Sequence, residues 1–446
     1  MPAWFEELSE FLRIPSVSAD PAHQDDVRRA GDWVCSLIRG AGGEAAIVDF
    51  ETPSGPYASQ PLAVGELRAS TDADHAPTVL CYGHFDVQPP DPLELWQSAP
   101  FEPEIRGEYL YGRGVADDKG QLYLLLAAAR QLALAGSLPV NVRFVCDGEE
   151  ETGGQSVLGY LAGDERGADV AVIFDSGMIA RDVPAFNVTT RGLVYFHVTL
   201  RSGERDLHSG HYGGAALNAV TALCELLASV SGSDGRLPEP LRAGVREPTE
   251  AERDGWRALP PGAEELALAG AAPRDAAAAG EYYRRTLAEP ALDVNGILGG
   301  SPTLEKTVLP VKAEANVSIR LAPGQDPERI AAAFTELLHA AAPAGATLDV
   351  ELMSRAEPGV IDPGSRAVAL GQDAFERALG VRPVLTGSGG TLPIVSALAR
   401  HGIPTIITGF SLPDANIHSP NERLLVDYVE RGIAAARALF EELAGL

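Results

Sequence analysis

Cysteines and long apolar runs are both scarce in this sequence, and each shortage excludes a class of protein. Only 4 cysteines occur among 446 residues. They show neither the CxxC spacing of a thiolate zinc site nor the density of a secreted disulfide scaffold. No stretch reaches the roughly 18 consecutive apolar residues of a membrane helix. The opening residues, MPAWFEELSEFL, mix acids into an amphipathic pattern, unlike a secretory signal. We therefore expect a cytoplasmic protein with reduced thiols and no membrane segment.

Basic residues are also few relative to acidic ones. The chain has 35 Lys and Arg against 62 Asp and Glu, which gives a formal net charge of -27. Nucleic-acid backbones and anionic membrane surfaces both require a basic face on the protein. We therefore expect no nucleic-acid or membrane partner, and instead a small-molecule substrate and a second copy of the chain. The length allows two or three domains.

The order of apolar patterns predicts an α/β protein with a largely parallel sheet flanked by helices. Short apolar runs bounded by polar residues are typical of buried parallel strands. Such runs occur at residues 78–82, 141–146, 170–174 and 405–408. Helical periodicity occurs at residues 4–12, 26–39, 121–134, 367–379, 392–399 and 426–443.

A middle portion of the chain has a different pattern. Residues 194–200 and 311–321 alternate apolar and polar side chains, as half-buried strands do. We therefore assign residues 191–355 to an inserted α+β lid or dimerisation domain. Residues 1–190 and 356–446 then form the two parts of one catalytic domain. Within the insertion, residues 232–280 are expected to form surface helices and loops.

Acidic and histidine side chains follow the predicted strands or lie in glycine-rich loops. They are His84 with Asp86, Asp117 with Asp118, Glu150 with Glu151, Asp175, and His418. Ligands of an open α/β sheet bind at this edge, beyond the carboxyl ends of the strands. Carboxylates and imidazoles without cysteine suit a catalytic zinc, manganese or cobalt site. Two such metals, about 3.5 to 4 Å apart, need a bridging carboxylate.

Each of these signals is weak when taken alone. A single histidine after a strand is usually structural, a Glu-Glu pair is usually a solvated face, and an aspartate after a strand is commonly a helix N-cap. Their joint occurrence along one predicted sheet edge is what favours a metal site.

Seven motifs extend the pattern over essentially the whole chain. They are GHFDVQ, LYGRGVADDKG, DGEEETGG, DLHSGHYGG, KTVLP, SIRLAP and IHSPNE. With these motifs in this order, the chain resembles the di-zinc metallopeptidase family that includes carnosine dipeptidase, aminoacylase and succinyl-diaminopimelate desuccinylase. The resemblance implies two Zn²⁺ per subunit, with Mn²⁺ or Co²⁺ as possible substitutes. It implies that His84 and Asp175 bind one metal, that Glu151 and His418 bind the other, and that Asp117 bridges both.

The same resemblance assigns roles to residues that do not bind metal. Glu150 would be the general base, Asp86 would orient the ring of His84, and His208 would stabilise the oxyanion in the partner subunit's site of a homodimer. Arg320 would clamp the substrate carboxylate. Further substrate contacts would come from Thr307, Thr391 and Gly390.

One loop departs from the family pattern. Relatives of the dipeptidase-like branch often carry Arg-Glu before the Gly-Gly of this loop, whereas Gly387 and Ser388 stand here. A charge on the substrate side is therefore missing.

Several functions remain open at this point. Hydrolysis of dipeptides is the leading hypothesis, because the motifs DVQP, DDKG and DLHSG are most similar to those of the dipeptidase-like branch. Deacylation or desuccinylation of N-acyl amino acids is the alternative within the same chemistry. A non-catalytic binding relative would be expected to have lost at least one ligand or Glu150. A calcium module would need an alternating Asp loop that the chain lacks.

Overall fold

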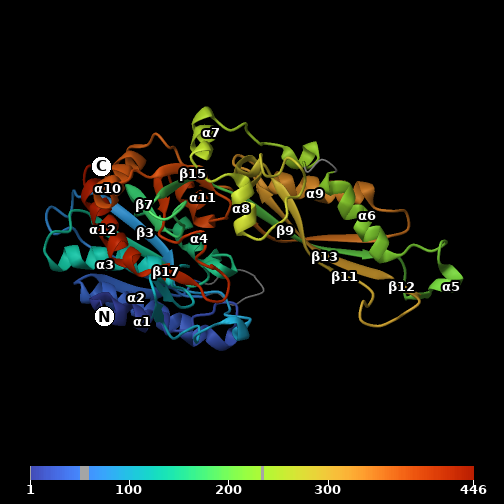
Figure 1. The fold of residues 1–446 in the computed structure, drawn as a ribbon, viewed down its shortest axis with the longest axis horizontal. Coiled ribbons are helices and arrows are strands. Elements are labelled where there is room, and N and C mark those ends of the chain that lie inside the picture. The colour runs from blue at the N-terminus through green and yellow to red at the C-terminus, as the bar shows by residue number, and fades with distance from the viewer. Residues whose placement is uncertain (1, 51–59, 233–235) are drawn as a thin grey trace. The chain divides into compact units, whose positions relative to one another are not determined.

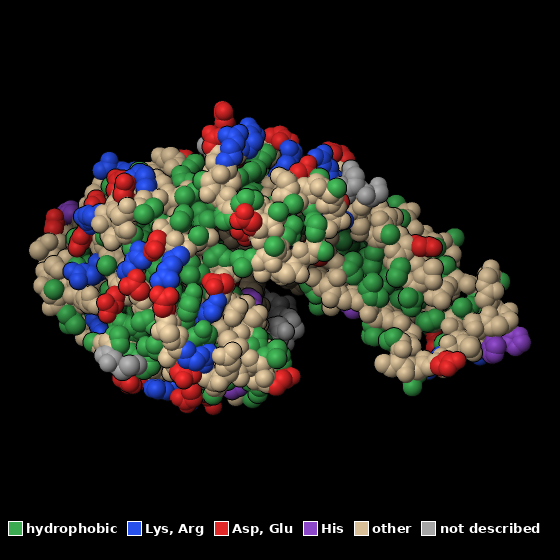
Figure 2. All heavy atoms as spheres, in the orientation of Figure 1, with side chains coloured by type: hydrophobic (Ala, Val, Ile, Leu, Met, Phe, Trp, Pro, Cys, Tyr) green, Lys and Arg blue, Asp and Glu red, His purple; other side chains and the backbone are tan. Residues whose placement is uncertain are grey.

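Residues 2–50, 60–232 and 236–446 are described by a computed structural model, and the chain divides into two units (Figure 1). Unit 1 comprises Met1–Val188, Ile361–Thr386 and Ile394–Leu446. Unit 2 comprises Thr189–Val360 and Gly387–Pro393. Acidic and basic side chains are mixed over the surface of unit 1 that Figure 2 shows.

One loop falls on the other side of the expected division. The sequence pattern predicts that residues 387–393 belong with the rest of 356–446 to the catalytic domain, whereas the structure groups them, together with residues 356–360, with unit 2. Two hydrogen bonds give the physical reason. The backbone N–H of Arg191 donates to the carbonyl of Gly390 at 3.0 Å, and Nη1 of Arg320 donates to Oγ1 of Thr391 at 2.7 Å.

A six-stranded sheet forms the centre of unit 1, with the order β1-β2-β6-β3-β7-β16. The pairs β6-β3, β3-β7 and β7-β16 are parallel, while β1 and β2 add an antiparallel edge. This confirms the expected α/β class with a mainly parallel sheet. The strands are β1 (Glu44–Val48), β2 (Leu62–Leu67), β3 (Thr78–His84), β6 (Asn141–Asp147), β7 (Val170–Phe174) and β16 (Thr405–Thr408).

Helices lie against this sheet and against one another. Helix α2 packs on β1 and β2, α3 packs on β3 and β7, and α12 packs on α3 and α10. The helices are α1 (Ala3–Leu12), α2 (Gln24–Gly40), α3 (Lys119–Leu134), α4 (Gln155–Ala162), α10 (Arg366–Leu379), α11 (Pro393–Arg400) and α12 (Val426–Leu443). Every residue of β6 and β7 is buried, which explains their continuous apolar sequences.

A smaller three-stranded sheet joins segments that are far apart in sequence. Its order is β17 (Arg423–Leu425), β5 (Tyr109–Tyr111) and β4 (Glu104–Arg106). The segment after His418 is thereby held beside the segment that precedes Asp117. A further two-stranded sheet pairs β8 (Ala185–Thr190) with β15 (Val384–Ser388).

Unit 2 is built on a four-stranded antiparallel sheet with the order β11-β13-β9-β14. Along β9 buried and half-buried residues alternate, as the sequence pattern predicts. Its strands are β9 (Gly192–Arg201), β10 (Leu207–His208), β11 (Ala291–Leu298), β12 (Val308–Leu309), β13 (Lys312–Leu321) and β14 (Thr347–Ala356). Its helices are α5 (Ser209–Tyr212), α6 (Ala219–Ser231), α7 (Glu250–Arg257), α8 (Gly262–Leu268) and α9 (Pro327–Ala341).

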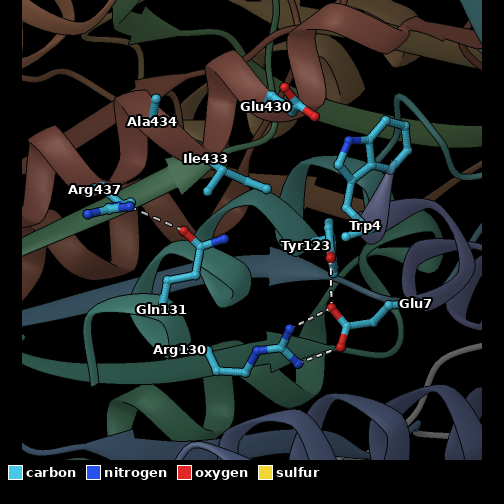
Figure 3. A pocket seen from close by; sticks show the side chains of 10 residues that line it. Trp4, Glu7, Tyr123, Arg130, Gln131, Glu430, Ile433, Ala434 and Arg437 are labelled. Atoms are coloured by element: carbon cyan, nitrogen blue, oxygen red, sulfur yellow. Dashed lines mark hydrogen bonds and ion pairs between the residues drawn. The ribbon is translucent and has the colours of Figure 1, made fainter. Parts of the chain in front are cut away.

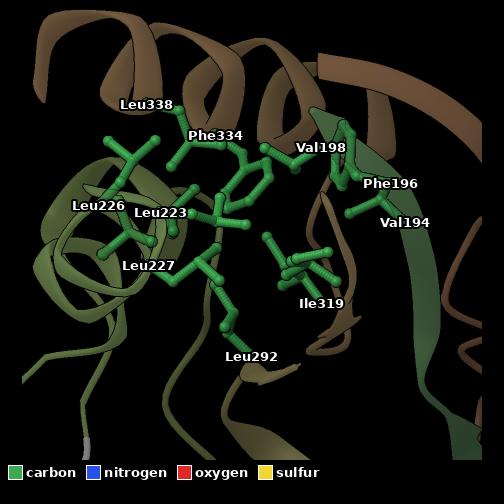
Figure 4. Packing of buried hydrophobic residues seen from close by; sticks show 14 of the residues in the cluster. Val194, Phe196, Val198, Leu223, Leu226, Leu227, Leu292, Ile319, Phe334 and Leu338 are labelled. Carbon is green, nitrogen blue, oxygen red and sulfur yellow. The ribbon is translucent and has the colours of Figure 1, made fainter. Parts of the chain in front are cut away.

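An apolar core joins this sheet to helices α6 and α9 (Figure 4). The ring of Phe196 on β9 packs against that of Phe334 on α9, with centroids 4.6 Å apart. Leu223 and Leu227 of α6 complete the buried layer. Unit 2 therefore has a hydrophobic core of its own.

The segment 232–280 contains the expected short helices, α7 and α8, although residues 233–235 lie outside the described residues. In the described part of the chain, no helix combines the length and the apolar character that crossing a membrane requires.

Candidate metal centre

The predicted ligands of unit 1 gather at the edge of the sheet where the parallel strands end. His84 is the last residue of β3, and Asp175 directly follows β7. Glu150 and Glu151 begin a short 3-10 turn soon after β6. His418 lies in the loop between β16 and β17. Parallel strands bring these separate segments to one edge.

The carboxylate of Asp117 lies between two imidazoles. Its Oδ1 is 2.9 Å from Nε2 of His84, and its Oδ2 is 2.9 Å from Nε2 of His418. On one side, Oδ1 of Asp175 is 4.0 Å from Nε2 of His84. On the other side, Oε2 of Glu151 is 3.2 Å from Nε2 of His418.

These contacts define two groups of three possible ligands. One group is His84, Asp117 and Asp175, the other is Asp117, Glu151 and His418, and the ligand atoms within each lie within 4.8 Å of one another. Asp117 belongs to both groups and presents a different oxygen to each imidazole. This arrangement fits two cations that share one carboxylate.

A buried oxygen supports the fit to a cation. Oε1 of Glu151 is buried and has no hydrogen-bond partner within the described residues, whereas Oε2 accepts from Nε2 of Gln88 at 2.8 Å. An unpaired buried carboxylate oxygen is costly. A cation bound by Glu151 would remove this cost.

Two carboxyl groups of the cluster, Asp175 and Glu150, have raised pKa values. Burial, followed by the charges of Asp117 and Glu151, raises the pKa of Asp175 to about 7. Burial and the neighbouring acids also raise the pKa of Glu150 well above its usual value. This crowding of like charges favours cation binding, because a cation would relieve the repulsion.

The two imidazoles show the complementary effect. Hydrogen bonds to Asp117 and Glu151 raise the pKa of His418 to about 10. Burial alone would lower the pKa of His84, but its acceptors Asp117 and Asp86 outweigh burial and raise it. Surroundings that favour a proton on these nitrogens also favour a metal cation in its place.

Asp86 holds two parts of the centre together. Its Oδ1 lies 3.2 Å from Nδ1 of His84. Its two oxygens also accept the backbone N–H groups of Glu150 at 3.2 Å and Glu151 at 3.1 Å. The hydroxyl of Ser18 donates to the same carboxylate at 2.6 Å. Asp86 therefore fixes one imidazole together with the turn that carries both glutamates.

The loop that carries His418 has a strained backbone. His418 has a φ of 59°, and Asn416 and Asn421 have φ values of 56° and 61°. Such left-handed positions cost about 1 to 3 kcal/mol for residues other than glycine and persist where the surroundings enforce them. The backbone N–H of Ser419 donates to the carbonyl of Asn416 at 3.0 Å, which closes the turn.

The candidate substrate residues of unit 2 fall into two groups. His208 pairs with Val308 across β10 and β12, and the carbonyl of Thr307 accepts from Ser209, so His208 and Thr307 lie together. Arg320 lies with Thr391 and Gly390 near the other end of β13. Strand β13 alone separates the two groups by about 25 Å, at 3.3 Å per residue.

Arg191 is a candidate that the sequence patterns missed. Its side chain is buried, and its Nε has no hydrogen-bond partner within the described residues. Burial, followed by the charge of Arg320, lowers its pKa to about 10. Two neighbouring guanidinium groups favour an anion such as a substrate carboxylate. Arg191 lies at a strand end beside a glycine, and nothing in the sequence there indicates that it could bind an anion.

Comparison with known proteins assigns the family. Residues 80–442 match the model of Peptidase family M20/M25/M40. The chain belongs to this family. A cysteinylglycine-S-conjugate dipeptidase of Corynebacterium striatum is 29% identical and aligns over 98% of this chain and 94% of its own. A Beta-Ala-His dipeptidase of Rattus norvegicus is 27% identical over 99% of this chain and 93% of its own.

Solved structures of similar proteins agree with this fold. The di-peptidase Dug1p from Saccharomyces cerevisiae has a TM-score of 0.85 at 25% identity, covering 100% of this chain and 96% of its own. An M20 family metallo-carboxypeptidase from Sulfolobus solfataricus has a TM-score of 0.88 at 25% identity, and each chain is covered to 100%. The resemblance to a metallopeptidase family and its dipeptidase-like branch is therefore confirmed.

Glu422 holds the loop that carries Asp117 in this M20/M25/M40 peptidase. Its side chain is fully buried. One oxygen accepts from Nη1 of Arg113 at 2.8 Å and from the backbone of Gly114 at 2.9 Å. The other accepts from the backbones of Ala116 at 2.8 Å and Asp117 at 3.0 Å. Sequence reasoning missed this role, and the only signal was the place of Glu422 in the IHSPNE motif.

We expect Glu422→Gln to weaken both folding and metal binding. A glutamine side chain has only one acceptor oxygen, and its NH₂ group would face the backbone N–H groups that Glu422 accepts from. It would also leave the buried Arg113 without a counter-charge. Removing one partner of a buried ion pair costs about 3 to 5 kcal/mol, and losing support for a ligand lowers metal affinity about 10-fold to 100-fold. Urea unfolding of the metal-free protein and chelator competition for zinc measure the two effects separately.

Glu108→Gln is the matched control. Glu108 is exposed and pairs with Arg181 at 3.0 Å, so this change should leave both quantities unaltered. Unchanged stability and zinc affinity in Glu422→Gln would show that the Asp117 loop does not depend on Glu422.

Proposed function

We propose that this M20/M25/M40 peptidase hydrolyses the peptide bond of dipeptides at a centre of two zinc ions. The observation that carries the proposal is the sharing of Asp117 between two ligand groups. The dipeptidases among its relatives support the choice of substrate. Mixed oxygen and imidazole ligands also suit manganese or cobalt.

The proposed assignment of ligands follows the contacts. His84 and Asp175 bind the first metal ion, and Glu151 and His418 bind the second. Asp117 bridges the two. When bound, such ions polarise the scissile carbonyl and lower the pKa of water toward about 7.

Glu150 is the proposed general base. Its raised pKa suits a group that must accept a proton and then release it. A carboxylate oxygen of Glu150 takes a proton from the attacking water and later delivers it to the nitrogen of the leaving amine. Asp86 keeps Glu150 in place through the backbone N–H at 3.2 Å.

Arg320 is the proposed ligand of the substrate carboxylate. Its guanidinium already donates to Oγ1 of Thr391, which fixes its direction. Thr391 and the backbone of Gly390 complete this side of the site. The buried Arg191 adds positive charge beside Arg320.

His208 is proposed to act in the active site of a partner subunit. An extended dipeptide spans about 7 Å, so it cannot contact both His208 and Arg320 of one chain when these lie about 25 Å apart along β13. The backbone N–H of Gly210 donates to Nδ1 of His208 at 3.0 Å, which leaves Nε2 to carry the proton of a neutral ring. That Nε2–H would donate to the oxyanion, and Thr307 would accompany it.

A homodimer formed through unit 2 has further support. Histidine side chains are exposed at the end of unit 2 that carries α5 (Figure 2). Strand β11 lies at the edge of its sheet and exposes Ile297 and Leu298, at 50% and 66% of their surfaces. An exposed apolar edge strand favours association.

A cytoplasmic location is part of the same proposal. In the part of the chain that the structure describes, all four cysteines carry free thiols, and Cys35, Cys81 and Cys146 are buried. Unpaired thiols persist in a reducing compartment.

We expect the purified protein to contain about two zinc ions per chain and to hydrolyse dipeptides. A panel of dipeptides, longer peptides and N-acyl amino acids, assayed with zinc, manganese or cobalt, measures the preference. Chelation should abolish turnover, and added metal should restore it. Turnover of N-acyl amino acids alone would overturn the choice of dipeptides, and full activity after complete metal removal would overturn the metal centre.

Substitution of the two adjacent glutamates should separate their roles. Glu150→Gln should retain both metal ions and lose turnover by about 100-fold to 10,000-fold, because proton transfer is removed. Glu151→Gln should instead weaken metal binding, because it replaces a ligand. Metal content and kcat measured on the same samples test both expectations. A metal-loaded Glu150→Gln protein with normal kcat would exclude Glu150 as the base.

Mixing two inactive proteins should restore activity if His208 acts across a dimer. His208→Ala should lose turnover by about 100-fold to 1000-fold, as an oxyanion donor does. After subunit exchange with Glu150→Gln, half of the dimers are mixed, and each mixed dimer has one site with both groups intact. Activity should therefore recover to about a quarter of that of the unchanged protein.

The control replaces Glu150→Gln by a chain that carries both substitutions. That mixture contains no site with both groups and should stay inactive. If exchange is demonstrated by mass spectrometry and activity does not return, His208 does not act in the partner's site.

A further inference from the structure

A pocket in unit 2 is lined by more basic than acidic residues. It lies against the start of β11 and has a volume of about 330 Å³, which is within the usual range for small-molecule sites. Five of its lining residues are arginines and three are acidic, whereas the whole chain has a net charge of -27. A basic pocket in so acidic a protein favours an anionic ligand. The arginines are Arg191, Arg236, Arg274, Arg284 and Arg285.

Ion pairs within the protein occupy two of these arginines. Arg284 pairs with Glu289 at 3.2 Å, and Arg285 pairs with Glu281 at 2.8 Å. Both glutamates line the pocket, and each of the two arginines has a second acidic partner as well. The third acidic lining residue, Asp293, is exposed and forms no ion pair within the described part of the chain. The paired arginines therefore need no ligand.

Arg191 is the buried cation of this pocket. It is 6% exposed and has no carboxylate partner among the described residues. Its Nη2 donates to the carbonyl of Glu289 at 3.0 Å, and its Nε is sealed off from solvent. Nη1 forms no hydrogen bond within the described residues and, unlike Nε, is not sealed off, so a ligand can reach it. Burial, followed by the charge of Arg320, lowers the pKa of Arg191 to about 10, as expected for a cation with too little counter-charge.

A pocket of unit 1, between α1, α3 and α12, shows the opposite case (Figure 3). There Arg130 forms two hydrogen bonds with the carboxylate of Glu7. The hydroxyl of Tyr123 donates to the same carboxylate at 2.7 Å. The charge of Arg130 is thus balanced by the protein itself, whereas the guanidinium of Arg191 meets only a backbone carbonyl.

The pocket of unit 2 adjoins the guanidinium that is proposed to bind the substrate carboxylate. Ala291 lines the pocket and pairs with Arg320 across β11 and β13. Directly opposite residues of antiparallel strands lie about 4.5 to 5.5 Å apart, with their side chains on the same face of the sheet. A substrate whose terminal carboxylate binds Arg320 therefore has its last side chain next to the pocket.

We propose that this pocket receives the side chain of an acidic C-terminal residue, so that the preferred dipeptides end in aspartate or glutamate. The inference rests on the proposed function and names its substrate class. The α-carboxylate binds Arg320, and the side-chain carboxylate binds Nη1 of Arg191. Arg274, which is exposed and makes one hydrogen bond, to the carbonyl of Ser231 at 3.3 Å, adds a further positive charge.

Charge selects an acidic residue over the others. Arg191, Arg274 and Arg320 have no carboxylate partner in the part of the chain that the structure describes. Asp293 is the unpaired acid whose charge acts on Arg191 and Arg320, so two positive charges remain. A C-terminal residue with two carboxylates balances both, whereas glutamine or leucine supplies one carboxylate. Lysine would add a cation to those already present.

The kcat/KM values for Gly-Glu and Gly-Gln test the proposal on the metal-loaded full chain. The two dipeptides have nearly the same shape and differ in the charge of the last side chain. Gly-Glu should be preferred about tenfold, because its carboxylate accepts a charge-assisted hydrogen bond. Gly-Lys should be the poorest of the three. Equal values for Gly-Glu and Gly-Gln, or a preference for Gly-Gln, would overturn the proposal.

Two exposed substitutions should move this preference in opposite directions. Arg274→Gln removes a cation and should lower the ratio of Gly-Glu to Gly-Gln about threefold, whereas Asp293→Asn removes an acid and should raise it about threefold. Arg329→Gln on α9, also exposed, is the control and should leave the ratio unaltered. Damage to the fold would affect both dipeptides alike. An unmoved ratio, or a shift of the same sign in both pocket variants, would count against the pocket.

Replacement of the buried arginine should have the largest effect. Arg191→Met removes the guanidinium and keeps an unbranched apolar chain, so the ratio should fall to about one. A retained preference for Gly-Glu in this variant would exclude Arg191 as the partner of the side-chain carboxylate. If Arg191→Met does not fold, the Arg274 and Asp293 variants still decide the question.

Binding of free amino acids separates this inference from the proposed function. Calorimetric titration of the metal-loaded chain should show that L-glutamate binds about tenfold more tightly than L-glutamine. Asp293→Asn should tighten the binding of glutamate alone, which would not occur if glutamate bound only to the metal ions. Turnover of both dipeptides without preference supports hydrolysis and overturns the pocket. Tighter binding of glutamate without turnover of any dipeptide supports the pocket and counts against hydrolysis.

Discussion

Repulsion among carboxyl groups is the constraint on which the centre of unit 1 depends. Asp86, Asp117, Glu150, Glu151 and Asp175 crowd the edge of one sheet, and the raised pKa of Asp175 reflects first its burial and then the charges of Asp117 and Glu151. Two imidazoles relieve part of it when they carry protons, and cations would relieve more. The free energy that this arrangement costs in the folded chain is therefore regained when metal binds.

Backbone N–H groups hold these carboxylates in place despite the repulsion. Asp86 accepts from the turn that carries the two glutamates, and Glu422 accepts from the loop that carries Asp117. Each joins segments that are far apart in sequence. Because these donors are backbone N–H groups, the hydrogen bonds do not depend on the side chains of the residues that donate them. The path of the main chain therefore defines the positions of the carboxylates.

Much of this arrangement could be predicted from the sequence because it depends on local pattern. The apolar run 170–174 coincides with β7, and Asp175 follows it directly. Glu422 was missed because its partners lie some three hundred residues earlier, and a glutamate in a loop is usually solvated. The grouping of residues 387–393 with unit 2 has a similar origin, because it rests on hydrogen bonds to Arg191 and Arg320 that no local pattern contains.

The order of the ligands along the chain has a consequence for protein synthesis. His84, Asp117 and Asp175 all precede unit 2, whereas His418 follows it. A growing polypeptide therefore carries all the proposed donors for one cation long before it carries His418, the last donor proposed for the second. On the ribosome the carboxylate of Asp117 meets its second imidazole only after the inserted unit has been made, so assembly of the paired centre is a late, post-insertion event in the life of each molecule.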